Sequence, residues 1–226
     1  MSSFVPGGSA LKHPDFTKWI PVCVPRDLKE SVILRVFCFH GAGMDVTVWS
    51  GVGTPRAPMA NPLVDLCQKE DVQMLAVRLP GRSVRSHEPI PATIQECASQ
   101  LLEVIEPLVS SSVPYVFVGY SMGCLVAFEL CCLLAKRKEE GAKVHMPIRV
   151  IVASMSSPDT PKEIRPWPDT RYLNDKEFQE ELRAWSCNEV LFQPDLWQAY
   201  SKLLRNDHNL LDAYVGTKLQ TPLGGL

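Results

Sequence analysis

The sequence has little of several features that would mark whole classes of protein. None of its apolar runs approaches the roughly 20 residues that a membrane-spanning helix needs. Its 23 basic residues are offset by 25 acidic ones, and the formal net charge of −2 argues against a binder of nucleic acid or anionic membranes. The N-terminus also lacks the apolar region of a signal peptide. We therefore expect a flexible leader over residues 1–18 and a cytoplasmic protein.

Eight cysteines are present, but their spacing is that of neither a metal site nor a redox motif. The sequence has no C-x-x-C pair and no Cys/His cluster with zinc spacing, so we expect no metal. Most of the thiols lie inside apolar runs, as at residues 37–39 and 130–133. We interpret them as small buried side chains in a reducing compartment.

The sequence does contain a series of short apolar runs separated by helical patterns. Four such runs predict strands, at residues 31–39, 72–80, 114–120 and 149–155. Runs that are apolar nearly throughout are typical of parallel strands buried on both faces. Two prolines within residues 19–25 favour an edge strand there. The alternation of strands and helices predicts a doubly wound, mostly parallel α/β sheet in a single domain over residues 19–226.

Helices are predicted at residues 61–70, at 92–109 and directly after Ser121. Residues 157–215 break the alternation. A proline-rich connection is followed there by two amphipathic patterns, at 175–186 with Asn174 as cap and at 196–215 with Asp195 as cap. A helical pair inserted at this point would lie where active-site lids lie, so we interpret it as a lid. The alternative is that the two helices only cover the core.

The clearest functional pattern is Gly119-Tyr120-Ser121-Met122-Gly123, between a predicted strand and a predicted helix. The turn is sharp, so the neighbours of the serine must be small, and it lifts the hydroxyl above the sheet edge. The helix that begins there directs unpaired N–H groups toward developing negative charge. We interpret Ser121 as a nucleophile and Gly119 and Gly123 as the residues that permit the turn. A capping serine in a glycine-rich turn is the alternative.

A nucleophilic serine needs hydrogen-bond donors for the oxyanion that its attack creates. In this arrangement the donors are the N–H of Met122 and an N–H from the loop after the first core strand. We favour Ala42 as the second donor, with Gly41 and Gly43 as alternatives. His40 precedes the serine, whereas the base follows it in this arrangement, so we interpret His40 as a residue that shapes the loop.

Five motifs occur in the order seen in one enzyme family: FCFHGAG at 37–43, RLPGR with a following Arg and Glu at 78–88, GYSMG at 119–123, Ser-x-x-x-Pro at 154–158 and LLRNDHNLLDAY at 203–214. With these motifs the sequence resembles the type II thioesterases. That family includes the gramicidin S-type editing thioesterases and the animal medium-chain S-acyl fatty acid synthase thioesterases. The resemblance implies the α/β-hydrolase fold with a helical lid over about residues 157–215.

The resemblance also implies the chemistry: Ser121 would hydrolyse an acyl thioester, with Ala42 and Met122 as the oxyanion hole. It implies no cofactor beyond the phosphopantetheine or CoA that carries the acyl group. The implied partner is an acyl or peptidyl carrier protein of a fatty acid, polyketide or nonribosomal peptide synthase. Three arginines of the second motif could contact such an acidic carrier, or could pair internally with carboxylates such as Glu88: Arg78, Arg82 and Arg85.

Two other interpretations compete with a thioesterase. One is a general carboxylesterase of the same fold. The other is a non-catalytic protein that binds acyl groups or carriers, and it is suggested by a departure from the family pattern. The family's acid lies in a G-x-x-D turn and its base in a G-x-H turn, and neither turn follows Ser121.

The remaining candidates for acid and base are Asp159 and His208. The polar neighbours of His208 favour a solvated turn of a helix around it. We therefore expect an incomplete triad on a truncated chain that lacks its last strands. An unpaired apolar edge is then expected at residues 149–155.

Overall fold

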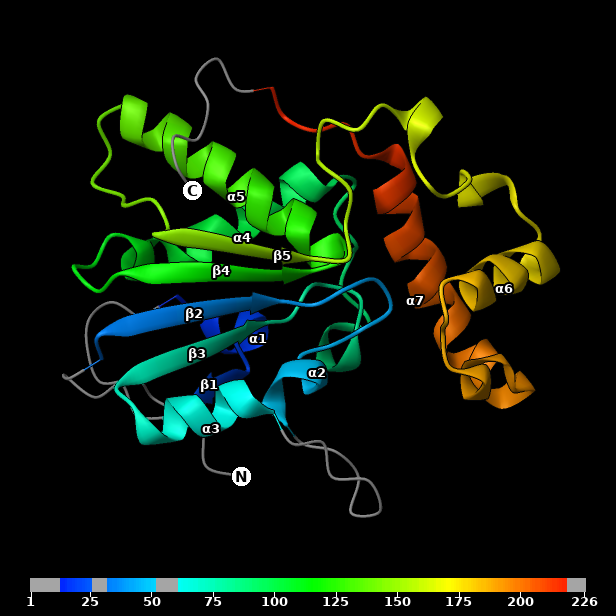
Figure 1. The fold of residues 1–226 in the computed structure, drawn as a ribbon, viewed down its shortest axis with the longest axis horizontal. Helices are drawn as coiled ribbons and strands as arrows, with labels where there is room; N and C mark the ends of the chain where they lie inside the picture. Colours follow the sequence, from blue (N-terminus) through cyan, green and yellow to red (C-terminus); the bar gives the residue numbers. More distant parts are fainter. Residues whose placement is uncertain (1–12, 26–31, 52–60, 219–226) are drawn as a thin grey trace.

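The computed structural model describes residues 13–25, 32–51 and 61–218, with five strands in one sheet (Figure 1). The strand order is β1-β3-β2-β4-β5. Four strands run parallel: β2 (Leu34–Phe39), β3 (Val72–Val77), β4 (Tyr115–Tyr120) and β5 (Arg149–Ala153). β1 (Val22–Val24) pairs antiparallel with β3 at one edge. The four predicted parallel strands and the predicted edge strand are confirmed, each with shorter bounds.

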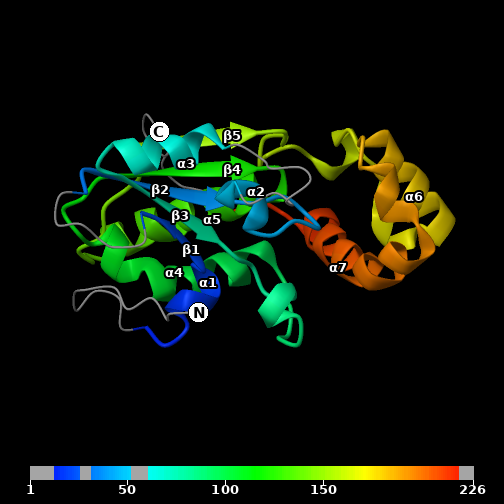
Figure 2. The same cartoon turned by 90° about the horizontal axis from the view of Figure 1, so that it is seen from below.

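Helices cover both faces of the sheet, as Figure 2 shows. One face carries α2 (Thr47–Ser50) and α3 (Pro62–Lys69), and the other carries α1 (Phe16–Trp19), α4 (Ile94–Val109) and α5 (Met122–Glu139). Along β2, Phe37 and Phe39 join the core on the α4 side, whereas Val36 and Cys38 join the core on the α3 side. Burial on both faces explains why the strands read as continuous apolar runs. The doubly wound α/β fold is therefore confirmed.

The last helices lie apart from the sheet, beyond the carboxyl ends of its parallel strands (Figure 1). They are α6 (Asp175–Ala184) and α7 (Pro194–Ala213). Short 3-10 turns occur at η2 (Ser83–Arg85), η3 (Lys162–Ile164), η4 (Thr170–Tyr172) and η5 (Glu189–Phe192). Phe178, Leu182 and Leu204 form a small core between the two helices. This is the place predicted for a lid, and its movement as a lid stays a prediction.

The helix caps agree with the sequence at α6 but differ at α7. Asn174 and Glu177 form the predicted capping box of α6, since each side chain accepts a backbone N–H from the other residue. At α7 the predicted cap, Asp195, is wrong. Gln193 is the N-cap and makes no side-chain capping bond. The helix begins one residue before Asp195, at Pro194, whose fixed φ suits the first helical position.

The expected boundary of the leader at residue 18 cuts through α1. Phe16 and Trp19 are both buried in the main core, so the folded domain includes residues before 19. Residues 1–12 of the expected leader lie outside the described residues.

All eight cysteines are free, and seven of them are buried. Burial raises the pKa of Cys23, Cys97 and Cys131 to about 12, which keeps these thiols protonated. Among the residues that the structure describes, no helix is long and apolar enough to cross a membrane. The same residues contain no His, Cys, Asp or Glu cluster that could hold a metal ion.

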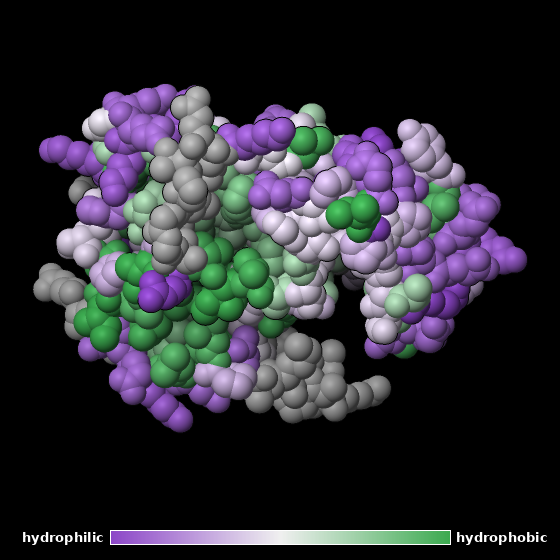
Figure 3. Space-filling model, turned by 45° about the horizontal axis from the view of Figure 1, so that its top comes forward, coloured by the Kyte–Doolittle hydropathy of each residue, from purple (hydrophilic) through white to green (hydrophobic). Residues whose placement is uncertain are grey.

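β5 forms the other edge of the sheet, and no strand of the described ranges pairs with its outer side. Ile151 and Val152 on this strand are 54% and 60% exposed. Figure 3 shows hydrophobic residues gathered over the half of the molecule that carries the sheet. For the described residues, the predicted unpaired apolar edge is confirmed.

Candidate active site

Ser121 stands alone between the last residue of β4 and the first residue of α5. Its backbone has φ +50° and ψ −126°, a conformation that L-residues rarely adopt. The Ser121 N–H donates to the carbonyl of Ala153 at 2.8 Å, and its carbonyl accepts the N–H of Cys124 at 2.8 Å. The turn is therefore fixed by β5 on one side and by α5 on the other.

The two glycines of the pattern lie where the backbone approaches other backbone atoms closely. A Cβ atom at Gly119 would lie 2.7 Å from the Cα of Cys124, and one at Gly123 would lie 2.4 Å from the carbonyl oxygen of Phe39. Neither position has space for a side chain. These contacts set the tight packing of strand, turn and helix around Ser121.

Ser121 opens onto a cavity of about 410 Å³, within the range of small-molecule sites. The cavity is lined by the loop at residues 41–44, by Ser121 with its neighbour Tyr120, and by residues of α6, α7 and the segment between them. His208 is among the lining residues. Asp159 is exposed and is not, so the structure brings His208, but not Asp159, into the cavity with Ser121.

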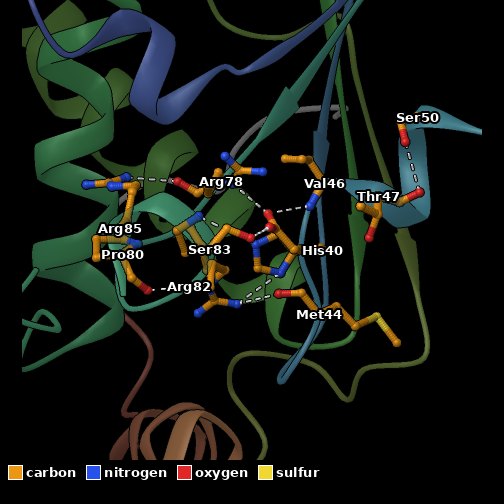
Figure 4. Close-up of polar contacts among 12 residues, drawn as sticks. His40, Met44, Val46, Thr47, Ser50, Arg78, Pro80, Arg82, Ser83 and Arg85 are labelled. Atoms are coloured by element: carbon orange, nitrogen blue, oxygen red, sulfur yellow. Dashed lines mark hydrogen bonds and ion pairs between the residues drawn. The ribbon is translucent and has the colours of Figure 1, made fainter. Parts of the chain in front are cut away.

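The loop before the cavity begins with His40, which is fully buried. Its Nδ1 lies 2.9 Å from the carbonyl of Gly41, and its Nε2 accepts the N–H of Leu79 at 3.5 Å. Burial, with Arg82 nearby, lowers the pKa of His40 to about 3, so the ring is neutral. Figure 4 shows His40 beside Arg82, whose Nη1 lies 3.4 Å from His40 Nδ1. These contacts suit a residue that shapes the loop.

The sequence offers three backbone N–H groups as the second oxyanion donor, and the structure excludes one of them. The N–H of Gly43 donates to Asp207 Oδ2 at 2.7 Å and is therefore occupied. Ala42 and Gly41 remain, and both line the cavity with Ser121. Met122 is the first residue of α5, a position whose N–H has no acceptor within the helix.

The three arginines of residues 78–88 pair internally with carboxylates, as one of the two sequence interpretations predicted. Arg78 Nε lies 2.8 Å from Asp45, Arg82 Nη2 lies 2.8 Å from Asp207, and Arg85 Nη2 lies 2.7 Å from Glu88. Figure 4 shows the three arginines in this loop region. Their charge is therefore neutralised within the fold.

His208 is not on a solvated turn, as its polar neighbours suggested. The residue is only 2% exposed, and its ring packs against Phe178 at 5.1 Å and Trp185 at 5.2 Å between centroids. Burial lowers the pKa of His208 to about 4. Its Nδ1 has no hydrogen-bond partner among the described residues. The expectation failed because the buried side of α7 includes polar residues: Asp207, His208 and Asp212.

Asp207 is the residue of this site that the sequence did not single out. It is fully buried and contacts both the loop at 41–44 and Arg82. The available signal was that two of the five motifs contain its partners, Gly43 in FCFHGAG and Arg82 in RLPGR. Asp207 itself lies in a third motif, LLRNDHNLLDAY.

Comparison with known protein families agrees with the features of this site. These features are the turn at Ser121, the loop beside it and the cavity between the sheet and the inserted helices. The protein family described as "Thioesterase domain" matches residues 61–223. The chain belongs to this thioesterase family. Members of the family are hydrolases that act on thioesters.

Individual relatives agree with this assignment. Gramicidin S biosynthesis protein GrsT of Aneurinibacillus migulanus is 26% identical over 202 residues, which are 87% of this chain and 68% of GrsT. The medium-chain S-acyl fatty acid synthase thioesterase of Rattus norvegicus is 24% identical over 82% of this chain and 64% of its own length. The solved structure of the type II thioesterase BorB, from the borrelidin biosynthetic cluster, matches with a TM-score of 0.64. The match has 24% identity and covers 92% of this chain and 74% of BorB, and it supports the α/β-hydrolase fold.

Proposed function

We propose that this chain hydrolyses acyl thioesters carried on the phosphopantetheine arm of an acyl or peptidyl carrier protein, with Ser121 as the nucleophile. One observation carries the proposal. In a member of the thioesterase family, Ser121 occupies a turn with φ +50° at the N-terminus of α5 and opens onto a cavity of about 410 Å³. The turn presents the hydroxyl to the cavity, and the helix places its positive end behind it.

The proposed reaction has two halves. Ser121 Oγ attacks the thioester carbonyl carbon and gives its proton to a base. The N–H groups of Ala42 and Met122 then donate to the oxyanion. The carbon–sulfur bond breaks, the thiol leaves with a proton, and water cleaves the acyl-serine ester to the free acid. No cofactor is required, because the acyl group arrives already attached to phosphopantetheine or CoA.

For the base, His208 is the one histidine among the described residues that lines this cavity. Its ring is neutral, and a neutral imidazole is the form that accepts a proton. Within the described ranges no hydrogen bond joins His208 to Ser121. Substitution of His208 therefore tests whether it acts as the base. Asp159, the candidate acid, is exposed and does not line the cavity, so its role is also tested by substitution.

The test combines a fluorophosphonate label with steady-state hydrolysis. We expect the label on Ser121, hydrolysis of acyl-carrier and acyl-CoA thioesters, and loss of both in Ser121→Ala. Ser154→Ala is the matched control, because Ser154 also has a positive φ after a strand but is exposed. His208→Gln and Asp159→Asn, measured beside them, show whether either group supports attack.

Three results would contradict the proposal in different ways. Faster hydrolysis of p-nitrophenyl esters than of thioesters would favour a carboxylesterase. Binding of acyl-carrier protein without any label on Ser121 would favour a non-catalytic binding protein. Equal turnover by Ser121→Ala and the wild type would remove Ser121 from the reaction.

A further inference from the structure

The loop at residues 41–44 is a four-residue turn whose central peptide has a defined orientation. The N–H of Met44 donates to the carbonyl of Gly41 at 3.3 Å and closes the turn. Gly43, at the third position, has φ +69°, whereas Ala42 is not among the residues with positive φ. This combination is that of a type II turn. Type I and type II turns differ mainly in the direction of the peptide between the second and third residues.

Asp207, on α7, holds that central peptide. Its Oδ2 accepts the N–H of Gly43 at 2.7 Å. The peptide unit is planar, so the direction of the Gly43 N–H also fixes the Ala42 carbonyl, which points the other way. The N–H of Ala42 belongs to the preceding peptide, whose Gly41 carbonyl accepts the N–H of Met44. Asp207, 164 residues further along the chain than Gly43, therefore acts on the Ala42 N–H through the turn that these two bonds hold.

Arg82 ties the same carboxylate to the rest of the loop. Its Nη2 donates to Asp207 Oδ1 at 2.8 Å, and its Nη1 donates to the carbonyl of Met44 at 2.7 Å. A third bond runs from its Nε to the carbonyl of Pro80 at 3.3 Å. Figure 4 shows Arg82 between Pro80 and Met44. The pair is almost free of solvent, with 3% and 0% of the two side chains exposed, so water does not replace these contacts.

The position of Asp207 on α7 links the turn to the predicted lid. Leu204, one turn earlier on the helix, packs so closely on the loop that a Cβ added to Gly43 would lie 2.4 Å from Leu204 Cδ2. Leu204 and His208, which flank Asp207 along α7, both line the cavity. A movement of α7 that opens the cavity would therefore also withdraw the acceptor of the Gly43 N–H.

We propose that Asp207 and Arg82 are positioning residues through which the lid helix α7 sets the oxyanion hole, so that Ala42 is aimed at the reacting carbonyl only while α7 is docked. This inference rests on the proposed function, in which Ala42 is the donor. Docking of α7 over the acyl group would then also assemble the oxyanion hole, which stabilises the transition state.

The experiment measures the turn and the chemistry separately in the full chain. Hydrogen exchange of the Gly43 amide, followed by NMR, reports the turn. Single-turnover acylation of Ser121 by an acyl-CoA reports the chemistry. Asp207→Ala removes the acceptor, and Asp207→Asn keeps one carbonyl oxygen in its place. Arg82→Met/Asp207→Leu removes both charges and keeps the interior free of an unpaired ion, in case Asp207→Ala fails to fold. Asp45→Asn is the control, since Asp45 pairs with Arg78 at the other end of the same loop.

We expect exchange at Gly43 to rise about tenfold or more in Asp207→Ala and in the double variant. We expect acylation to slow by about 100-fold, the size of losing one oxyanion donor, with KM nearly unchanged because the donor acts in the transition state. Asp207→Asn should fall between, and Asp45→Asn should match the wild type.

A freed Gly43 amide with unchanged acylation would overturn the proposal. So would slow acylation with unchanged Gly43 exchange, or an Asp45→Asn variant as slow as Asp207→Ala. A wild type that does not acylate at Ser121 would instead defeat the proposed function, and with it the catalytic consequence. Gly43 exchange would still decide whether Asp207 orients the turn.

Discussion

Two regions of the molecule differ in the kind of group that they bury or expose. One is the junction of α7 with the loop at 41–44, and the other is the outer edge of β5. At the junction, ionic groups are buried and fully partnered: Arg82 and Asp207 satisfy each other and two backbone groups of the loop. At the edge, apolar side chains are exposed: Ile151 and Val152 contact no further strand of the described residues.

The difference shows where directional contacts are concentrated in this molecule. Polar groups out of water must be paired with defined geometry, so the junction specifies one arrangement of the loop beside Ser121. An exposed apolar edge specifies nothing, since many surfaces could cover it. A substitution at the junction should therefore change folding and catalysis, whereas one at the edge should change association.

The largest effect is expected from breaking the buried pair on one side. Arg82→Met leaves the Asp207 carboxylate buried without its cation and should lower the free energy of unfolding by about 3–5 kcal/mol. Adding Asp207→Leu to that variant should recover most of the loss, since no buried charge remains. Denaturant titrations of the two single variants and the double variant measure the coupling.

Lys176→Met is the control for that titration. The ion pair of Lys176 with Glu180 is on the surface of α6, with side chains 86% and 59% exposed, and its loss should cost about 0.5 kcal/mol or less. If Arg82→Met cost no more than Lys176→Met, the buried pair would not stabilise the junction.

A smaller effect is expected from adding one methyl group to the turn. In Gly43→Ala the new Cβ would meet Leu204 at 2.4 Å and the residue would keep φ +69°, so we expect a loss of about 2–4 kcal/mol. Gly141→Ala separates the two causes, because Gly141 has φ +88° with no atom within 4 Å of the added Cβ. That variant should lose only about 1 kcal/mol. Thermal melts that ranked the two variants equally would show that α7 does not press on the loop.

Sequence patterns predicted the parts of this structure that depend on neighbouring residues. The strands follow from apolar runs, the cap of α6 from Asn174 and Glu177, and the turn at Ser121 from glycines two residues to either side. Each of these signals lies within a few positions of the feature it produces.

The junction could not be predicted in this way, because Arg82 and Asp207 lie 125 residues apart. Arg82 lies in a turn-like Pro-Gly-Arg-Ser stretch and Asp207 among polar neighbours, and both patterns usually indicate a solvated surface. The same reasoning misplaced His208 on a solvated turn and left Arg82 open to a carrier contact. Tertiary packing of α7 on the loop decides which charges are buried. A local sequence pattern does not contain that information.

The smallest effect on stability, and a distinct one on association, is expected at the edge of β5. Ile151→Lys replaces an exposed apolar side chain, so the free energy of unfolding should change by less than about 0.5 kcal/mol. A lysine on an open edge opposes strand pairing between copies, and we expect concentration-dependent light scattering of the isolated chain to fall. Ile164→Lys makes the same change at a 70% exposed isoleucine on η3, away from the sheet, and should leave the scattering as in the wild type. Because the two variants remove equal hydrophobicity, a difference between them reports the unpaired strand and not the loss of an apolar side chain. A wild-type chain that stays monomeric and scatters no more than Ile151→Lys at any concentration would show that the edge is not a site of association.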